Sequence, residues 1–289
     1  MVEAVELRVL SPGDEARLLE FLSAHIETSL ISISNVERVG LVDRGEPFQA
    51  TYVARFDAAG AITAVAGHAW NGNILLQGDA GLEPAVKRAV EVTGRPVRGL
   101  IGAWALVCRA RRALGLESTP GSHDGPELLY SLSLNELRVP PLLSRSDVAL
   151  RTPSAAETRD TLVGWRVAYD IETLGSLRTP ELEQRACRML EGWLAAGTLW
   201  VLTVGGELVA MTGFNAQARG IVQVGGVFTP ESRRGRGYAR AAVAGSLKLA
   251  LARGAARSLL FTSETNHAAR RAYEALGYRV IGDFGLVLF

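Results

Sequence analysis

Residues 230–240 read PESRRGRGYAR and lie between an apolar stretch at residues 221–228 and a stretch with helical character that begins near Tyr238. Glycines among the arginines let the backbone approach a ligand closely and direct successive N–H groups at one anion. The N-terminus of a helix behind them adds partial positive charge. Residues 231–257 hold seven basic side chains and one acidic side chain. The sequence therefore predicts an anion site at a strand-to-helix turn, with a diphosphate as the natural ligand; a solvated surface loop is the alternative.

Two other phosphate-binding patterns do not fit this segment. A P-loop would end in Gly-Lys-Ser or Gly-Lys-Thr, and no such tripeptide follows the glycines. A dinucleotide fingerprint would need glycine or alanine at position 240, where Arg240 stands. It would also need an acidic residue about 20 residues further on, but residues 255–260 read AARSLL.

The spacing of apolar residues around the segment predicts a mixed order of strands and helices, β-α-α-β-β-β-α-β-α-β. In the second half of the chain we expect strands at residues 148–151, 199–204, 207–214, 221–228, 258–263 and 278–289, and helices at about residues 154–174, 179–196, 238–253 and 266–276. In the first half we expect strands at residues 5–10, 51–56, 62–70, 73–77, 99–101 and 128–134, and helices at residues 12–24, 83–92 and 103–114. The similar order favours two copies of one fold.

The seam between the halves is expected where Pro140 and Pro141 stand side by side, since two prolines neither continue a helix nor fit a central strand. A chain of 289 residues is expected to form about two domains. The sequence therefore predicts a first domain at residues 1–138, a linker at residues 139–146 and a second domain at residues 147–289.

The second half resembles the GNAT superfamily of N-acetyltransferases. Arg234, Gly237 and Ala239 match the Arg/Gln-x-x-Gly-x-Gly/Ala signature that binds the pyrophosphate of acetyl-coenzyme A in that family. Residues 227–230, VFTP, resemble the entry into the family's loop, and residues 266–278, NHAARRAYEALGY, resemble its Asn…Ala…Tyr…Leu-Gly-Phe/Tyr block. The resemblance covers about residues 147–289.

The resemblance implies an α/β (α+β) fold with two GNAT-like domains, each a mixed, mostly antiparallel central sheet flanked by helices. The first half departs from the family pattern at the place that corresponds to the signature. Residues 76–84 there read LQGDAGLEP, without the signature and with two acids where phosphates would lie. The chain is therefore similar to tandem GNAT proteins in which one domain is active and the other, here the N-terminal one, is degenerate and does not hold the cofactor.

The activity that the resemblance implies is transfer of an acetyl group from acetyl-coenzyme A to a primary amine, by direct attack in a ternary complex and without a metal. A backbone N–H near Val227 is the implied oxyanion donor. A bulge at Gly225 and Gly226 is expected to part this strand from its neighbour, where the family binds acetyl-coenzyme A. The implied cofactor-binding residues are Val227, Phe228, Thr229, Arg234, Gly235, Arg236, Gly237, Tyr238, Ala239, Arg240 and Asn266.

Tyr273 matches the tyrosine acid of the family, which protonates the leaving thiolate. A phenol has a pKa of about 10 and a thiol one of about 8.5, so this transfer is reasonable at neutral pH. Packing beside Ala269 and Leu276 is the alternative role for this side chain. Asn266 could likewise be a plain helix N-cap.

The sequence does not identify a general base, because residues 221–228 carry no carboxylate and only Gln223 as a polar side chain. Asp170, Glu172 and Glu264 are considered, and each is interpreted as a solvated charge. Relatives contact the acceptor from the helix that here carries Trp165 and Tyr169, together with Asp170 and Glu172, although Trp165 also fits core packing.

Composition excludes several classes of partner. Thirty-one basic and 30 acidic residues leave a net charge of +1, unlike a nucleic-acid binder. No apolar run reaches the roughly 18 residues of a membrane span, and the first residues lack the pattern of a signal peptide. Four scattered histidines and two cysteines have no metal-ligand spacing. We expect a cytoplasmic protein whose partner is a small-molecule or peptide amine, and a homodimer stays open.

Two further interpretations stay open beside the N-acetyltransferase. One is a module that binds acetyl-coenzyme A for sensing or interaction without turnover. The other is an acyltransferase that uses a different acyl-coenzyme A. The identity of the acceptor amine is not readable from the sequence.

Overall fold

The computed structural model describes residues 6–289, which form two compact units. The first unit comprises the residues up to Glu127 together with Asp283–Phe289, and the second comprises Leu128–Gly282. This division differs from the expected linker at residues 139–146. The second unit already begins at Leu128, and the last residues of the chain belong to the first unit. Strand β6 (Pro126–Ser133) follows the first half in sequence but lies beside β11 of the second unit. The end of β12 (Arg279–Leu288) pairs with β5 of the first unit.

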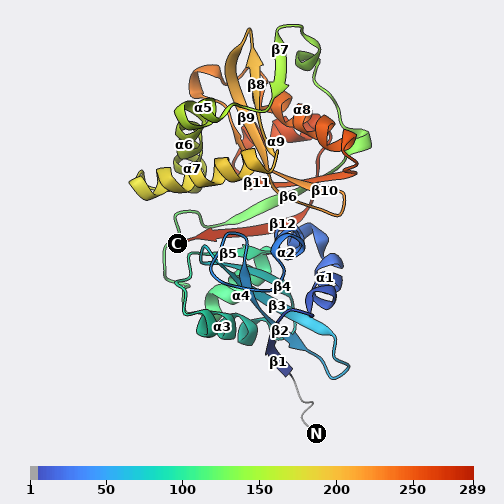
Figure 1. Ribbon diagram of the computed structural model, residues 1–289, viewed down its shortest axis with the longest axis vertical. Helices are drawn as coiled ribbons and strands as arrows, with labels where there is room; N and C mark the ends of the chain where they lie inside the picture. Colours follow the sequence, from blue (N-terminus) through green and yellow to red (C-terminus); the bar gives the residue numbers. More distant parts are fainter. Residues whose placement is uncertain (1–5) are drawn as a thin grey trace. The chain divides into compact units, whose positions relative to one another are not determined.

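The second unit contains the expected order of strands and helices (Figure 1). The helix expected at residues 154–174 is interrupted by a π-helical turn at Thr158–Leu162. The strand expected at residues 207–214 continues for four more residues, to Ala218. Besides β6 and the start of β12, its elements are β7 (Val148–Arg151), α5 (Ala155–Glu157), η3 (Thr158–Leu162), α6 (Val163–Leu174), α7 (Pro180–Ala195), β8 (Leu199–Val204), β9 (Glu207–Ala218), β10 (Ile221–Phe228), η4 (Glu231–Arg233), α8 (Tyr238–Ala252), β11 (Arg257–Ser263) and α9 (His267–Leu276), with two short 3-10 turns, η1 (Leu134–Glu136) and η2 (Pro141–Ser144), after β6.

The strands of the second unit form a mixed, mostly antiparallel sheet with helices on both faces. Its order is β6-β11-β10-β9-β8-β7, and the β10–β11 pair is parallel whereas β7–β8, β8–β9 and β9–β10 are antiparallel. Leu190 of α7 is buried with Met211 of β9 on one face, and Leu247 of α8 is buried with Val222 of β10 on the other. These two apolar layers hold β10 in place between α6–α7 and α8 (Figure 1).

The first unit repeats this order. Its elements are β1 (Glu6–Val9), α1 (Glu15–Ser23), α2 (Ile26–Val39), β2 (Ala50–Phe56), β3 (Ile62–Ala69), β4 (Asn73–Gly78), α3 (Leu82–Thr93), β5 (Gly99–Gly102) and α4 (Trp104–Ala113). The sheet order is β1-β2-β3-β4-β5 followed by the end of β12, with β4–β5 as the parallel pair. Val5, the first residue of the expected strand at residues 5–10, lies outside the described residues.

Helix α2 is an element that the sequence did not predict. Residues 31–34 read ISIS, an alternation typical of a strand. In the structure, the residues buried at a spacing of three, as on one face of a helix, are Leu30, Ile33 and Val36. The side chains of Ser29 and Ser32 are also buried. Tertiary packing therefore overrides the local pattern here.

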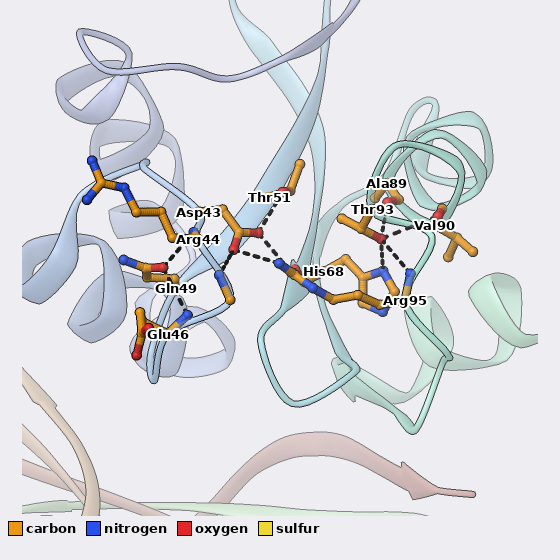
Figure 2. Close-up of polar contacts among 11 residues, drawn as sticks. Asp43, Arg44, Glu46, Gln49, Thr51, His68, Ala89, Val90, Thr93 and Arg95 are labelled. Carbon is orange, nitrogen blue, oxygen red and sulfur yellow. Dashed lines mark hydrogen bonds and ion pairs between the residues drawn. The ribbon is translucent and has the colours of Figure 1, made fainter.

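A network of polar side chains joins the loop after α2 to the rest of the first unit (Figure 2). Arg95 binds both carboxylate oxygens of Asp43, at 2.8 and 2.7 Å, and donates to the His68 carbonyl oxygen at 3.0 Å. The Thr51 hydroxyl donates to Asp43 at 2.7 Å, and Thr93 Oγ1 lies 2.7 Å from His68 Nδ1. Despite burial, these hydrogen bonds and Arg95 lower the pKa of Asp43 to about 2. The His68 pKa is also lowered, because burial disfavours its charged form.

Candidate functional site

Strands β10 and β11 separate in the middle of the second unit. Their parallel pairing covers Ile221–Gln223 and Arg257–Leu259 only, although β10 continues to Phe228 and β11 to Ser263. The pairing of β10 with β9 also shifts between Gly225 and Phe228. Gly226 has φ +58° there, a left-handed conformation that favours glycine. The expected bulge is present, and it lies where the two strands part.

The turn that follows β10 is built around two left-handed glycines. The η4 turn ends at Arg234, Gly235 and Gly237 both have φ +77°, and α8 begins at Tyr238. Among residues 6–289, no group accepts a hydrogen bond from the backbone amides of residues 235–240. Unpaired amides in such a turn, at the N-terminus of a helix, form a ready anion site.

The arginines of this turn have different surroundings. Arg234 Nε donates to the Thr229 carbonyl oxygen at 3.0 Å, and Arg234 Nη2 donates to Glu172 of α6 at 2.5 Å. Arg236 is exposed, and the buried Nε atom of Arg240 has no hydrogen-bond partner within residues 6–289. The guanidinium of Arg234 thus fastens the turn to α6, while Arg236 and Arg240 keep their charges for a ligand.

The predicted cofactor-binding residues at the end of β10 lie on opposite faces of the sheet. Val227 packs against the core cluster beneath α8, whereas Phe228 is buried on the α6–α7 face, where its ring centroid lies 6.1 Å from that of Trp165. Thr229 is 9 % exposed, and its hydroxyl is buried without a partner. Trp165 is therefore a packing residue.

Tyr273 and Asn266 lie on α9, and both also have structural roles. The Asn266 side chain accepts a hydrogen bond from the Ala269 amide at 3.1 Å and caps the helix. The half-buried ring of Tyr273 packs against the same core cluster as Val227, and its centroid lies 5.9 Å from that of Tyr278. Tyr273 and Val227 thus pack against the same core cluster.

The tyrosines around Tyr273 already have hydroxyl partners. Tyr278 Oη lies 2.6 Å from Ser258 Oγ, and Tyr130 Oη donates to Glu274 at 3.0 Å. Burial raises the pKa of both phenols. These two residues are part of the core.

The interpretation of Asp170 as a solvated charge is wrong. Its side chain is 2 % exposed and accepts a hydrogen bond from Arg166 Nη2 at 2.6 Å. Glu172 is paired with Arg234, and Glu264 is exposed. Sequence reasoning missed Arg166, although an arginine and an aspartate four residues apart on an apolar helix face are a signal for an ion pair.

The corresponding turn of the first unit is filled by its own side chains. Arg109 donates to Glu83 at 2.7 and 2.9 Å, to the Asp79 carbonyl oxygen at 2.8 Å, and also contacts the Asp79 carboxylate. A side chain at Gly81 would collide with Arg55. Two carboxylates and two arginines therefore stand at the N-terminus of α3, where the second unit has unpaired amides.

Within the described chain there is no cluster of three or more side chains suited to a metal ion. None of the helices there combines the length and apolar character that crossing a membrane requires.

Comparisons with known proteins find one matching family model and several solved structures of similar fold. The model of the acetyltransferase (GNAT) family matches residues 155–278. The fold is similar to a GCN5-related N-acetyltransferase from Sphaerobacter thermophilus (TM-score 0.60, 13% identity, 98% of this chain and 94% of that one). It is also similar to a tandem GNAT protein from the clavulanic acid biosynthesis pathway (0.59, 13%, 98% and 97%) and to a GNAT-family acetyltransferase from Colwellia psychrerythraea (0.52, 13%, 98% and 99%). No curated protein sequence matches the chain significantly.

Proposed function

We propose that the second unit, whose residues 155–278 match the acetyltransferase (GNAT) family model and whose chain has a fold similar to that of a tandem GNAT protein, transfers an acetyl group from acetyl-coenzyme A to a primary amine. The acceptor is a small molecule or a peptide end, and the reaction takes place in the cytoplasm without a metal. The first unit does not bind the cofactor.

One observation carries this proposal: the backbone amides of residues 235–240 are unpaired in the described chain and stand at the start of α8. A diphosphate carries several acceptor oxygens and negative charge, so it satisfies these donors and interacts favourably with the helix terminus. Arg236 and Arg240 add positive charge at the same turn. In the first unit, Asp79 and Glu83 occupy the corresponding place and already pair with Arg109 there.

Acetyl-coenzyme A, when bound, supplies the acetyl group as a thioester. The separation of β10 from β11 after Gln223 leaves β10 backbone groups for an extended ligand arm. The Val227 amide, which follows the bulge glycine, is the donor to negative charge that develops on the acyl oxygen. Tyr273 donates its phenolic proton to the leaving sulfur. Asn266 caps α9 and so fixes the helix that carries this tyrosine.

The test is thiol release from acetyl-coenzyme A over a panel of amines, with coenzyme A binding measured separately by calorimetry. We expect at least one amine to turn over, and Tyr273→Phe to lower kcat by about 10²-fold while coenzyme A still binds. Tyr278→Phe is the matched control: it removes a neighbouring hydroxyl that is bound to Ser258 and leaves kcat nearly unchanged.

Each of the other outcomes would support one of the alternative functions or exclude Tyr273 from the reaction. Coenzyme A binding without turnover of any amine would favour a non-catalytic sensing module. Faster turnover with a longer acyl chain would make the protein an acyltransferase for another acyl-coenzyme A. Equal loss in both tyrosine variants would remove Tyr273 from the chemistry.

A further inference from the structure

The guanidinium of Arg166 is buried against the bulge of β10. Arg166 is 6 % exposed, and a Cβ built on Gly226 would lie 3.3 Å from its Nη1 atom. The guanidinium therefore lies beside the space that a side chain on Gly226 would occupy, immediately before Val227, the residue whose amide is assigned to the acyl oxygen. Arg166 comes from α6 and crosses the layer between that helix and the sheet.

Most hydrogen-bonding capacity of this guanidinium is unused. Nη2 donates to Asp170, but Nε is buried without a partner, and no described group accepts from Nη1. An arginine offers five N–H donors, and a buried donor without an acceptor costs free energy. The faces of Tyr169 and Trp193, at 4.6 and 5.9 Å from the guanidinium carbon, stabilise the charge but accept no conventional hydrogen bond.

An unpaired acceptor faces the same layer. Val222 and Val224 of β10 belong to the core beneath α8, so Gln223 between them points to the α6–α7 face. Gln223 is 1 % exposed, and its buried Oε1 atom has no hydrogen-bond partner among the described residues. Arg166 and Gln223 thus present unmatched donors and one unmatched acceptor on one face of β10, at the point where it leaves β11.

The charges around Arg166 favour an anion. Asp170 Oδ2 lies 4.0 Å from Arg185 Nη2, so one carboxylate stands against two guanidinium groups. Glu172, the other acid of this helix end, is paired with Arg234. The cluster of Arg166, Asp170 and Arg185 therefore keeps one unbalanced positive charge. The two oxygens of a carboxylate match an arginine fork.

We infer that the acceptor of the proposed acetyl transfer is an α-amino acid or a similar amino carboxylate, whose carboxylate binds Arg166 and whose N–H donates to Gln223. The inference rests on the proposed function. Because a side chain on Gly226, next to Val227, would meet Arg166, the carboxylate and the reacting amine must be close together. A long diamine or polyamine without a carboxylate does not satisfy Arg166.

The test compares each amino acid with its own amide as acceptor. The amide has more unprotonated amine at neutral pH, so a preference for the acid cannot arise from amine basicity. For wild-type protein we expect kcat/KM to be about 10- to 100-fold higher for the acid of the preferred pair, chiefly through KM. Arg166→Lys keeps the charge but loses the fork, and we expect it to reduce this ratio about tenfold.

Two further variants keep the test independent of folding. Arg166→Gln combined with Asp170→Asn replaces the ion pair by neutral amides and is expected to abolish the preference while coenzyme A still binds. Arg188→Gln removes an exposed arginine of α7 and is expected to retain it. Amine turnover without any preference for the carboxylate, or a preference that survives the double substitution, would overturn this inference and leave the acetyltransferase intact. Absence of coenzyme A binding would overturn the proposed function, and the inference with it.

Discussion

Gln223 and Leu259 are the last residues that pair β10 with β11. Beyond them the strands separate, β10 bulges at Gly226, and its end leads into the turn with unpaired amides. Arg166 of α6 is buried beside the bulge glycine, Gly226.

The bulge requires glycine for two reasons that can be separated. Gly226 has φ +58°, and a Cβ there would lie 2.7 Å from the Trp193 ring. Gly205 has the same φ, +58°, but open space around it. We expect Gly205→Ala to cost about 1 kcal/mol through backbone strain alone, and Gly226→Ala to cost about 1–3 kcal/mol more through overpacking.

Urea unfolding of the two variants measures this difference. Equal losses of unfolding free energy would mean that Trp193 does not hold the bulge against α7. Gly226→Ala should also reduce any acetyl transfer, because it displaces Arg166 and the Val227 amide, whereas Gly205→Ala should not.

The Arg166–Asp170 pair should be strongly coupled in stability. Asp170→Asn leaves a buried guanidinium without its counter-charge, and we expect a loss of about 3 kcal/mol in the free energy of unfolding. Adding Arg166→Gln should recover most of that loss, because no uncompensated charge remains. A double-mutant cycle in urea reports the coupling, and additive losses would contradict a buried ion pair.

Acid should weaken the first unit through Asp43. Its pKa is lowered to about 2, chiefly by its hydrogen bonds to Arg95 and Thr51 against the opposing effect of burial. The stabilisation is complete above the unfolded pKa of about 3.9 and is lost as the pH falls through about 2. We expect about 2 kcal/mol of unfolding free energy to disappear between pH 5 and pH 2.

Asp43→Asn isolates this contribution, because the variant has no carboxylate to protonate at that position. Its unfolding free energy should be lower than that of the wild type at pH 5 and should fall less steeply towards pH 2. Parallel pH profiles for the two proteins would assign the acid sensitivity to other carboxylates.

Local signals explain which features the sequence predicted. The turn at residues 230–240 and the order of elements around it depend on glycine, proline and apolar spacing within short windows, and the structure agrees with them. No element was predicted between residues 24 and 51, where residues 31–34 alternate like a strand although packing makes them helical. Strand β6 joins the second unit, and the end of β12 joins the first. Both arrangements depend on pairing between segments that are distant in sequence, which no local pattern encodes.

The site was predicted less completely, for a physical reason. Backbone amides, left-handed glycines and the Asn266 cap follow from residue type and position. The burial of a side chain does not follow from residue type and position. In the sequence, Asp170 was interpreted as a solvated charge, and Arg166 was not singled out. Only the packing of α6 against β10 makes these two residues a desolvated pair with unused donors.

Titration of the protein with coenzyme A in a calorimeter tests the central claim most directly. Gly237→Glu places a carboxylate among the amides of residues 235–240, and Gly254→Glu makes the same change at a glycine with positive φ (+90°) at the other end of α8. The account predicts one coenzyme A per wild-type chain, retained in Gly254→Glu and abolished in Gly237→Glu. No binding to the wild type, two molecules per chain, or equal binding to both variants would contradict it.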